Sequence, residues 1–422
     1  MKYSLGLMAA LGLVHVVSLS FLSIIRQKLP WYREESVTPG YPLVTLHNEI
    51  LDFCDLITPT TEEQEKTAIA LQYVKDVVFQ TCGPKVRVEV FGSQLTGLLQ
   101  PNSDIDAVCL GAKWDALTTL GQVMSRRSNR GEVHNVTVIH KAKVPLVKFV
   151  HTATGKQVDI SFNQDSGLLT GSAAKEMMAQ MITVRPLVLV LKYFMRQRRL
   201  HETFQGGIGS FLLQLMVISV VQKCGRTYTG HGIHGPTNLG FVLLEFLDLF
   251  GNKLNYCAAG ITLLGQDGGG FYNKRDMGWV KHERPALLSF QNPHDSGIDV
   301  GSNSFKVGDC RRAFQAVHER LIVAMFCSTQ TSHQWTGSLL SHVIFPDEGL
   351  ASRTLPKINS NLVWKNEGEH QMEDVQEVYG ESSSSYKRKA SGESHKSKRK
   401  QGRRSYDGAS SRRRRPNPAE SY

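Results

Sequence analysis

Two acidic residues stand close together after a Gly-Ser pair, and their spacing is typical of phosphate and metal chemistry. The segment Phe91–Ala107 reads FGSQLTGLLQPNSDIDA, with Asp104 and Asp106 two positions apart. Side chains two apart on a strand point to the same face of a sheet. Two close carboxylates are costly unless a cation neutralises them, and Mg²⁺ is usually held by carboxylates together with substrate phosphates. The motif predicts a metal-dependent nucleotidyl transfer site.

The flanking residues predict the elements that position these carboxylates. Val86–Phe91 alternates apolar and polar residues as a half-buried strand does, and Ile105–Leu110 is expected to be the next strand. Between them, Gly92 and Ser93 break the first strand, where glycine permits close phosphate approach and the serine hydroxyl can donate. The alternative for Asp-x-Asp alone is a surface turn with two solvated aspartates.

A third carboxylate is expected from a neighbouring strand, because two-metal transfer usually uses one. Asp159 lies in the apolar segment Gln157–Phe162, which follows a predicted strand at Val144–Val150 and a hairpin turn at His151–Lys156. A lone strand aspartate more often faces solvent. Here its apolar neighbours predict a mostly buried strand, where an unpaired carboxylate is unfavourable.

Several motifs in one order resemble the DNA polymerase β-like nucleotidyltransferase superfamily, and within it the Trf-type poly(A) RNA polymerases of TRAMP-like complexes. The resemblance covers about Pro30 to Leu340. It rests on FGSxxTGLxxPxSDID and VDISFN, and on the segments Leu46–Phe53, Arg185–Leu200, Phe204–Met216, Asn238–Gly251 and Ile298–Phe305.

The resemblance implies an α+β fold, with a polymerase β-like nucleotidyltransferase domain, a mainly helical PAP-associated domain and a disordered basic C-terminal tail. It implies Mg²⁺ or Mn²⁺ at the carboxylates, ATP as substrate, and Asp159 as general base on the RNA 3′-hydroxyl. The implied catalytic and metal residues are Asp104, Asp106 and Asp159. The implied nucleotide contacts are Gly92, Ser93, Gly167, Lys192, Ser210, Phe211 and Asp299.

The residues themselves leave alternatives to three of these nucleotide contacts. Lys192 lies inside a strongly apolar helical segment, where it needs a partner or else snorkels to the surface. The glycines of Gly206–Gly209 permit close ligand approach or simply form a flexible loop. Phe211 alone is more often a core residue than a stacking platform.

Three departures from the family pattern bear on base selectivity. Relatives commonly have tyrosine at Phe211 and an acidic pair where this chain has Gln291-Asn292. They have Asn-Asp-Val-Gly-Arg where this chain reads IDVGS, so that Ile298 and Ser302 replace the asparagine and the arginine. Isoleucine cannot hydrogen-bond a base edge, and serine cannot form a charge pair as arginine does.

The chain divides into five predicted segments. Residues 1–29 are hydrophobic, 30–60 are expected to pack on the helical domain, 61–184 form the catalytic domain, 185–345 form the helical domain, and 346–422 are linker and tail. The catalytic domain is predicted to begin with a helix at Thr61–Thr81, with Thr61 and Gln64 as a capping box. Seven dispersed cysteines without a C-x-x-C motif indicate a reducing compartment and no structural zinc.

The positive charge of the chain is concentrated at one end. The segment 387–415 carries a net charge equal to the +11 of all 422 residues, which leaves the rest near neutral. Clustered charge of this kind predicts a sequence-independent grip on RNA and a nuclear-import signal; the alternative is a solvated tail that aids solubility. The predicted RNA-binding residues are Lys387, Arg388, Lys389, Lys398, Arg399, Lys400, Arg403, Arg404, Arg412, Arg413, Arg414 and Arg415.

The segment Leu5–Ile25 is apolar and long enough to span a bilayer, and Lys2 precedes it as in a signal or anchor. A membrane anchor, an organellar leader and a non-native start to the chain remain open. The expected location is the nucleus or nucleolus, with a membrane or an organelle as the alternative.

The predicted function is template-independent addition of adenylates to RNA 3′ ends, in RNA processing, quality control or decay. A terminal uridylyltransferase and an inactive RNA-binding scaffold are the alternatives. The predicted partners are an RNA 3′ end and, from the resemblance, a zinc-knuckle RNA-binding protein and an RNA helicase.

Overall fold

The computed structural model describes residues 29–356, except 102, 143, 230–237, 266–268 and 331–336. The chain divides into two units, Met1–Pro356 and Lys357–Tyr422. The Leu5–Ile25 segment and the predicted RNA-binding tail both lie outside the described residues. Among the residues that are described, no helix is both long and apolar enough to cross a membrane.

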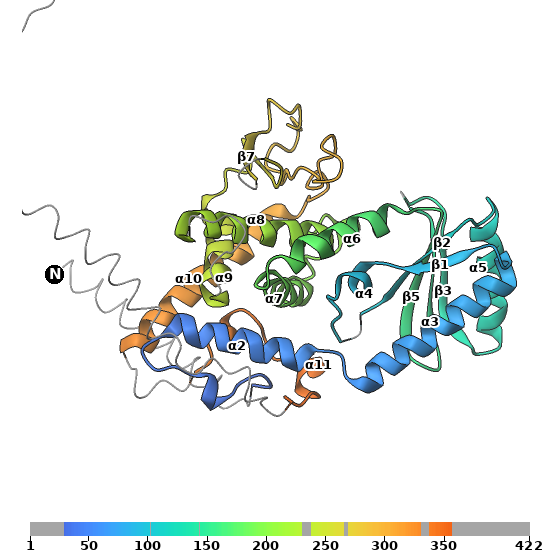
Figure 1. Ribbon diagram of the computed structural model, residues 1–422, viewed down its shortest axis with the longest axis horizontal. Coiled ribbons are helices and arrows are strands. Elements are labelled where there is room, and N and C mark those ends of the chain that lie inside the picture. The colour runs from blue at the N-terminus through green and yellow to red at the C-terminus, as the bar shows by residue number, and fades with distance from the viewer. Residues whose placement is uncertain are drawn as a thin grey trace, which may run out of the picture. The chain divides into compact units, whose positions relative to one another are not determined.

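A five-stranded sheet forms one lobe of the first unit, which we call the sheet lobe (Figure 1). Its strands are β1 (Arg87–Val90), β2 (Ile105–Leu110), β3 (Val133–Ile139), β4 (Leu146–His151) and β5 (Lys156–Phe162). Their order across the sheet is β1-β2-β5-β4-β3, and the β2–β5 pair is parallel while the other pairs are antiparallel. The strands predicted at 86–91, 105–110, 144–150 and 157–162 are confirmed, the second with the same bounds.

Helices of the sheet lobe complete its core. They are α3 (Thr61–Cys82), α4 (Gly92–Thr96), α5 (Ala116–Asn129) and α6 (Ser166–Ala179). Apolar residues of α3 and α5, such as Val74 and Leu120, are buried with Ile105 and Ala107 of β2 in one cluster. This packing leaves the alternate residues of β2 to face away from the core.

The capping box of α3 lies one residue earlier than the sequence pattern indicated. The hydroxyl of Thr60 accepts from the Glu63 backbone N–H (3.2 Å), and the Glu63 carboxylate accepts from the Thr60 N–H (2.8 Å). The prediction that Thr61 and Gln64 form this box is therefore wrong. Thr60 is extended and Thr61 is the first helical residue, so only Thr60 is in position to cap.

The remaining helices form a second lobe, which we call the helical lobe. It contains α2 (Pro42–Ile57), α7 (Val184–Gln197), α8 (Ser210–Thr229), α9 (Leu239–Asp248), α10 (Val307–Gln330) and α11 (Glu348–Ala351). Short 3₁₀ segments occur at η1 (Glu34–Ser36), η2 (Thr203–Gln205) and η4 (Leu340–His342), a π-helical turn at η3 (Leu249–Lys253), and a hairpin at β6 (Ala259–Thr262) and β7 (Gly270–Asn273).

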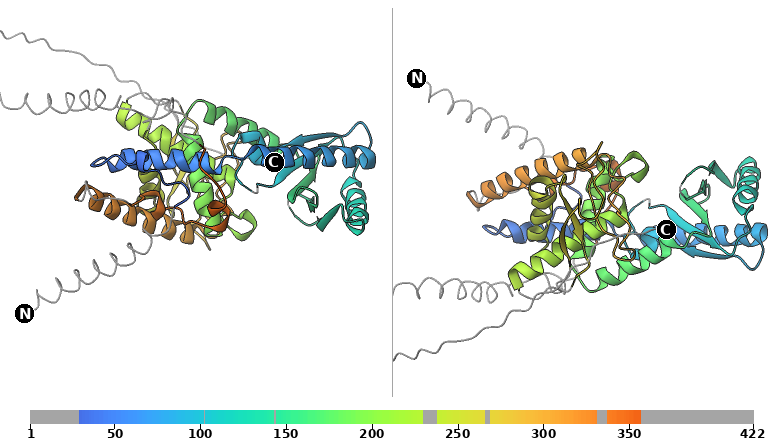
Figure 2. Two further views of the ribbon diagram at one scale, coloured as in Figure 1. Left: turned by 90° about the horizontal axis from the view of Figure 1, so that it is seen from below. Right: turned by 90° about the horizontal axis from the view of Figure 1, so that it is seen from above.

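Helix α2 belongs to the helical lobe although it comes first in the chain. Leu46, Ile50 and Phe53 are fully buried in one cluster with residues of α7, α9 and α10, and Figure 2 shows α2 lying beside these helices. The prediction that Leu46–Phe53 packs with the later helices is confirmed. The same cluster includes Leu98 and Met178, so the two lobes share part of their packing.

Side chains of α7 also join the two lobes through the loop that leads to the acidic pair. Lys192 Nζ donates to the Leu98 carbonyl (3.2 Å), Arg185 Nε to that of Gly97 (3.2 Å) and Arg196 Nη1 to that of Pro101 (3.2 Å). Gln100 Nε2 donates a hydrogen bond in the other direction, to the Leu189 carbonyl (2.8 Å).

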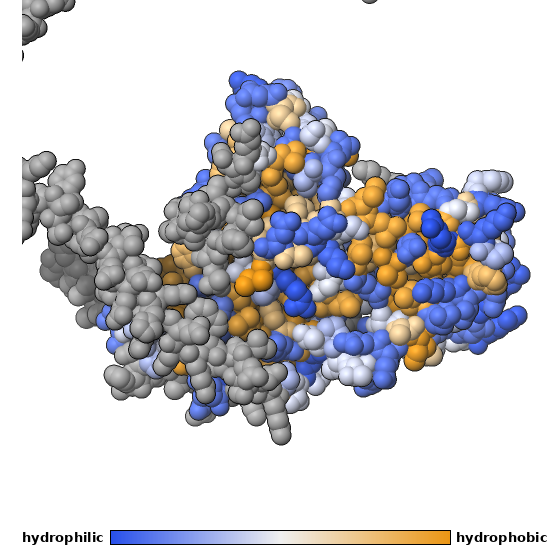
Figure 3. Space-filling model, viewed as in Figure 1, coloured by the Kyte–Doolittle hydropathy of each residue, from blue (hydrophilic) through white to orange (hydrophobic). Residues whose placement is uncertain are grey.

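On the face seen in Figure 3, hydrophilic residues cover much of the outer surface, whereas apolar residues gather over the region of α4 and β1.

Candidate active site

The two strands that carry the predicted carboxylates lie side by side. In the parallel β2–β5 pair, Asp106 is the register partner of Asp159. Asp104 immediately precedes β2, while the alternating Ile105 and Ala107 are buried in the sheet core. The sheet therefore places Asp104 and Asp106 away from that core and next to Asp159, in the arrangement that the spacing predicted.

Gly92, the first residue of the Gly-Ser pair, lies directly against this acidic group. Gly92 has a φ of +63°, and a Cβ added there would lie 2.2 Å from Asp106 Oδ2. The neighbouring Phe91 N–H donates to the Asp106 carbonyl (3.0 Å). Only glycine leaves room for the Asp106 carboxylate in this conformation, which gives the Gly92-Ser93 break a structural reason.

Burial and mutual repulsion act together on the carboxylates. Burial, then the charges of Asp159 and Asp104, raise the pKa of Asp106 to about 6. Burial and the charge of Asp159 raise the pKa of Asp104. Burial also raises the pKa of Asp159, although Lys148 opposes the shift. Each carboxylate is therefore costly to ionise beside the others, and a cation between them would offset that cost.

Individual carboxylate oxygens differ in how they are satisfied. Gln157 Nε2 donates to Asp104 Oδ2 (2.8 Å), and Lys148 Nζ lies 2.7 Å from Asp159 Oδ2. Asp159 Oδ1 is buried and has no hydrogen-bond partner. A buried acceptor without a partner is unfavourable unless a ligand completes it. These oxygens are the hard ligands that Mg²⁺ or Mn²⁺ prefers.

The described part of the chain contains no group of three acidic, histidine or cysteine side chains already drawn together as a metal centre. The contact between Lys148 and Asp159 bears on this result, because the ammonium occupies one oxygen of the third carboxylate. The donor set is suited to a divalent cation, but in this conformation a lysine stands next to it.

Lys192 reaches toward the carboxylates from the other lobe. It lies on α7 among buried apolar residues, and its ammonium donates to the Leu98 carbonyl. Burial lowers the pKa of Lys192 to about 8, while the charge of Asp106 opposes the shift. Because the Lys192 ammonium bonds to the Leu98 carbonyl of the sheet lobe, the side chain does not extend along its own helix to open solvent. Its predicted contact with phosphates stays a prediction.

The other predicted nucleotide contacts occupy distinct environments. Gly167 lies in the first turn of α6, where an added Cβ would come within 2.9 Å of the Phe91 ring. Ser210 is exposed at the first residue of α8, and the adjacent Phe211 is partly buried against the helical core. The roles of these three residues toward a nucleotide remain predictions.

Asp299 organises its own loop. Its carboxylate accepts from the Phe290 N–H (2.9 Å), the Gly301 N–H (2.9 Å) and the Ser289 hydroxyl (3.0 Å). Its neighbour Ile298 keeps 47% of its surface exposed. The nucleotide contact of Asp299 remains a prediction. Of these two neighbours, Ile298 is the one whose side chain is exposed to solvent.

Sequence reasoning missed Lys148 and Gln157, which contact the carboxylates directly. A signal for Lys148 was present, because a hairpin turn at 151–156 pairs residue 148 with residue 159, as the structure does.

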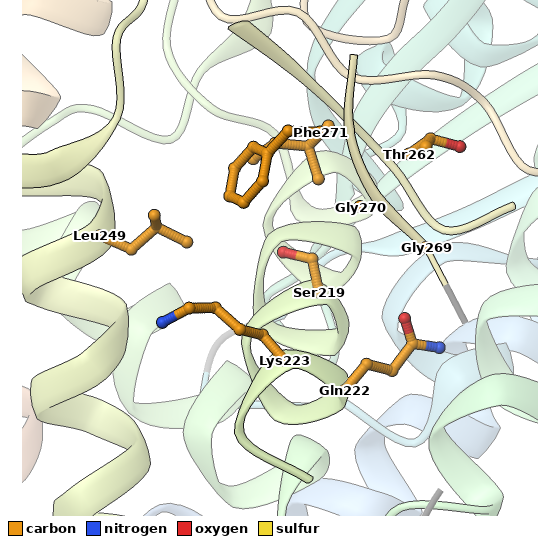
Figure 4. A pocket seen from close by; sticks show the side chains of 9 residues that line it. Ser219, Gln222, Lys223, Leu249, Thr262, Gly269, Gly270 and Phe271 are labelled. Atoms are coloured by element: carbon orange, nitrogen blue, oxygen red, sulfur yellow. The ribbon is translucent and has the colours of Figure 1, made fainter. Parts of the chain in front are cut away.

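A separate cavity lies between α8 and the β6–β7 hairpin (Figure 4). It is lined by Ser219, Gln222, Lys223, Leu249, Ile261, Thr262, Gly269, Gly270 and Phe271. It contains none of the predicted site residues.

The sheet lobe and the helical lobe together have the fold of a polymerase β-like nucleotidyltransferase. Comparison with protein families agrees: residues 46–172 match the central palm domain of mitochondrial-like poly(A) RNA polymerases, and residues 238–297 match the Cid1 family poly A polymerase domain. A solved structure of the polymerase core of TRAMP, an RNA surveillance complex, is similar with a TM-score of 0.67 and 27% identity, covering 76% of this chain and all of that one.

Two curated relatives give the family. The poly(A) RNA polymerase cid14 of Schizosaccharomyces pombe is 37% identical over 285 residues, which are 66% of this chain and 40% of that protein. Trf4-2 of Drosophila melanogaster, named as an inactive poly(A) RNA polymerase, is 32% identical over 69% of this chain and 72% of its own length. The chain belongs to the Trf-type poly(A) RNA polymerase family. It spans less than half the length of cid14.

Proposed function

We propose that this protein adds adenylates to RNA 3′ ends without a template, using a divalent cation, Mg²⁺ or Mn²⁺, held by Asp104, Asp106 and Asp159. The observation that carries the proposal is the register pair of Asp106 and Asp159 beside Gly92. Family membership supports the same reaction, since cid14 and its relatives are named poly(A) RNA polymerases.

The residues of the site have complementary roles in this reaction. The RNA 3′-oxygen attacks the α-phosphate of ATP, and pyrophosphate leaves. Asp159 Oδ1, buried and unpartnered, is the acceptor for the proton of the 3′-hydroxyl. Lys192 supplies a positive charge to the phosphates from the helical lobe. A bound divalent cation would supply charge to the phosphate under attack.

The remaining assignments follow the same reaction. Gly92, Ser93 and Ser210 approach the phosphates, Gly167 lies near the nucleotide, and Phe211 stacks on the base. The basic segment 387–415 holds the RNA electrostatically and favours a nuclear location. An RNA helicase and a zinc-knuckle RNA-binding protein are the proposed partners, because the sequence resemblance to Trf-type polymerases implies them; the similarity to the TRAMP polymerase core supports an assembly of this kind.

The test is incorporation of each of the four nucleotides into an RNA primer by purified protein, with and without Mg²⁺. We expect ATP to be incorporated and Asp106→Ala to abolish incorporation without lowering the unfolding temperature, because removing a ligand removes charge stabilisation of the transition state but also relieves repulsion among the carboxylates. Full activity in a folded Asp106→Ala variant would overturn the proposed metal site.

Ile298 favours a second candidate, a terminal uridylyltransferase or an enzyme of relaxed selectivity. It is exposed where relatives carry an asparagine, and it has no polar atom for a base edge. We expect weaker discrimination of ATP over UTP than in an enzyme with asparagine there, and a sharper preference in Ile298→Asn. Equal selectivity in both proteins would remove Ile298 from base recognition.

The inactive scaffold remains the third candidate, because the name of Trf4-2 shows that the family includes an inactive member. All three carboxylates are present in this chain, which favours the enzyme. RNA binding with no incorporation of any nucleotide would favour the scaffold.

A further inference from the structure

Lys148 occupies a place in the site that the proposed reaction does not use. It stands on β4 directly across from Asp159 on β5, between the buried residues Val147 and Phe149. Because strand side chains alternate, this places the lysine on the same side of the sheet as the three carboxylates. Its ammonium lies 2.7 Å from Asp159 Oδ2.

The surroundings make this contact more than a surface ion pair. The Asp159 side chain is only 16% exposed and that of Lys148 is 36% exposed, so water screens the pair partially. The other nearby cation, Lys192, donates to the Leu98 carbonyl. Lys148 is thus the lysine that pairs with Asp159, through Oδ2, while Asp159 Oδ1 has no hydrogen-bond partner.

We propose that Lys148 is a resident counterion of the acidic site. It holds Asp159 in the metal-free protein and competes with the divalent cation for the same carboxylate. The inference rests on the proposed function, because it assumes that Asp159 is a metal ligand. It assigns Lys148 a positioning role, in which the lysine keeps three like charges tolerable until the cation and the triphosphate arrive.

The proposal predicts the direction in which cation affinity changes when Lys148 is replaced. Removing a positive charge from the site, and freeing Asp159 Oδ2, leaves more negative charge for an incoming cation. An ion pair of this exposure is worth up to about a fivefold change in an equilibrium constant. If Lys148 instead served only to orient Asp159, its loss would weaken cation binding.

The experiment measures Mn²⁺ binding to the full chain by electron paramagnetic resonance, in the absence of nucleotide and RNA. We expect Lys148→Gln to bind Mn²⁺ up to about fivefold more tightly than the native protein. Lys148→Arg should bind as the native protein does, because it keeps the charge. Lys141→Gln, which removes an exposed lysine from the loop before β4, is the matched control and should leave the affinity unchanged.

A double variant locates the effect. In the Asp159→Asn background, Lys148→Gln should tighten Mn²⁺ binding less, because the shared carboxylate has gone and only the charge of Lys148 on Asp104 and Asp106 remains. Unchanged or weaker binding in Lys148→Gln overturns the inference, as does equal tightening in the two backgrounds. Lys148→Met, which also lacks the charge, replaces Lys148→Gln if the latter fails to fold. Nucleotide incorporation is measured separately, so a protein that shows this Mn²⁺ pattern and incorporates nothing contradicts the proposed function alone.

Discussion

At the scale of single residues, the contact between Gly92 and Asp106 is the most restrictive in the site. Gly92→Ala places a methyl group where Asp106 Oδ2 lies, in a backbone conformation that side chains rarely adopt. We expect nucleotide incorporation to fall at least about a hundredfold, because a displacement of catalytic groups by about 1 Å has an effect of that size. Single-turnover kinetics with saturating ATP measures this loss.

Gly97→Ala is the matched control for this variant. Gly97 has a similar φ of +71°, but an added Cβ meets no atom within 4 Å. The two substitutions therefore share their backbone strain and differ in the contact with the carboxylate. Similar losses of activity in both would attribute the effect to strain in α4 and not to Asp106.

A second prediction concerns Lys192. Lys192→Ala should raise the apparent KM for ATP about tenfold or more, because the variant cannot form the buried charge-assisted bond to phosphate. Steady-state kinetics over a range of ATP concentrations checks this. Arg185→Ala is the control, since it removes another bond from α7 to the same loop. If both variants raise KM equally, Lys192 acts by joining the lobes and not by binding phosphates.

At the scale of elements, α2 fastens the end of the helical lobe through a buried carboxylate. Glu49 is fully buried, and its two oxygens accept from the backbone N–H groups of Leu339 (3.2 Å) and Leu340 (2.6 Å). Burial raises the pKa of Glu49 to about 8. A buried acid of this kind binds its proton more tightly in the folded protein than in the unfolded chain.

This shift gives a third prediction, for stability against pH. Because the folded pKa is raised above its ordinary value, the contribution of Glu49 is fully present below about pH 4.5 and is lost as pH rises through about 8. Between pH 5 and 8, the free energy of unfolding of the native protein should fall more steeply with pH than that of Glu49→Gln. The two slopes should differ by up to about 1.4 kcal/mol per pH unit. Urea unfolding at several pH values measures the slopes.

Glu65→Gln, at an exposed glutamate of α3, is the control and should keep the native slope. Parallel curves for the native protein and Glu49→Gln would show that Glu49 keeps its charge on folding. In that case the bonds to Leu339 and Leu340 outweigh its desolvation.

The elements also show how far the sequence could predict the site. Strand Ile105–Leu110 was predictable to the residue, because the turn residues Pro101–Ser103 precede its apolar run and Gly111 follows it. The capping box was misplaced because Thr60–Glu63 and Thr61–Gln64 both match the motif, and only the helix start separates them. The bonds from α7 to the Gly97–Pro101 loop end on backbone carbonyls, which every residue has, so no sequence pattern indicates them.

At the scale of the whole molecule, the net positive charge of the chain is concentrated in the sequence segment 387–415. Truncation at about Glu381 removes segment 387–415 and with it most of the net positive charge of the chain. We expect weaker RNA binding at low salt and a flatter dependence of log K on log salt, by about 0.7 for each single-strand phosphate that the protein no longer neutralises. Binding measured at several salt concentrations gives this slope.

The same truncation should leave kcat on saturating RNA nearly unchanged, because Asp104, Asp106 and Asp159 precede the cut. An unchanged affinity and an unchanged salt slope would assign RNA binding to the folded lobes or to a partner protein.

The parallel pairing of β2 with β5 has a consequence for how the molecule acquires its site during synthesis. β5 enters the sheet between β2 and β4, so the hairpin of β3 and β4 is made before the strand that separates it from β2. Pairing of segments so far apart in sequence forms late in folding, since the intervening loop must close first. A nascent chain that ends before Lys156 therefore carries Asp104, Asp106 and Lys148 but not Asp159, and the acidic group is complete only when β5 docks.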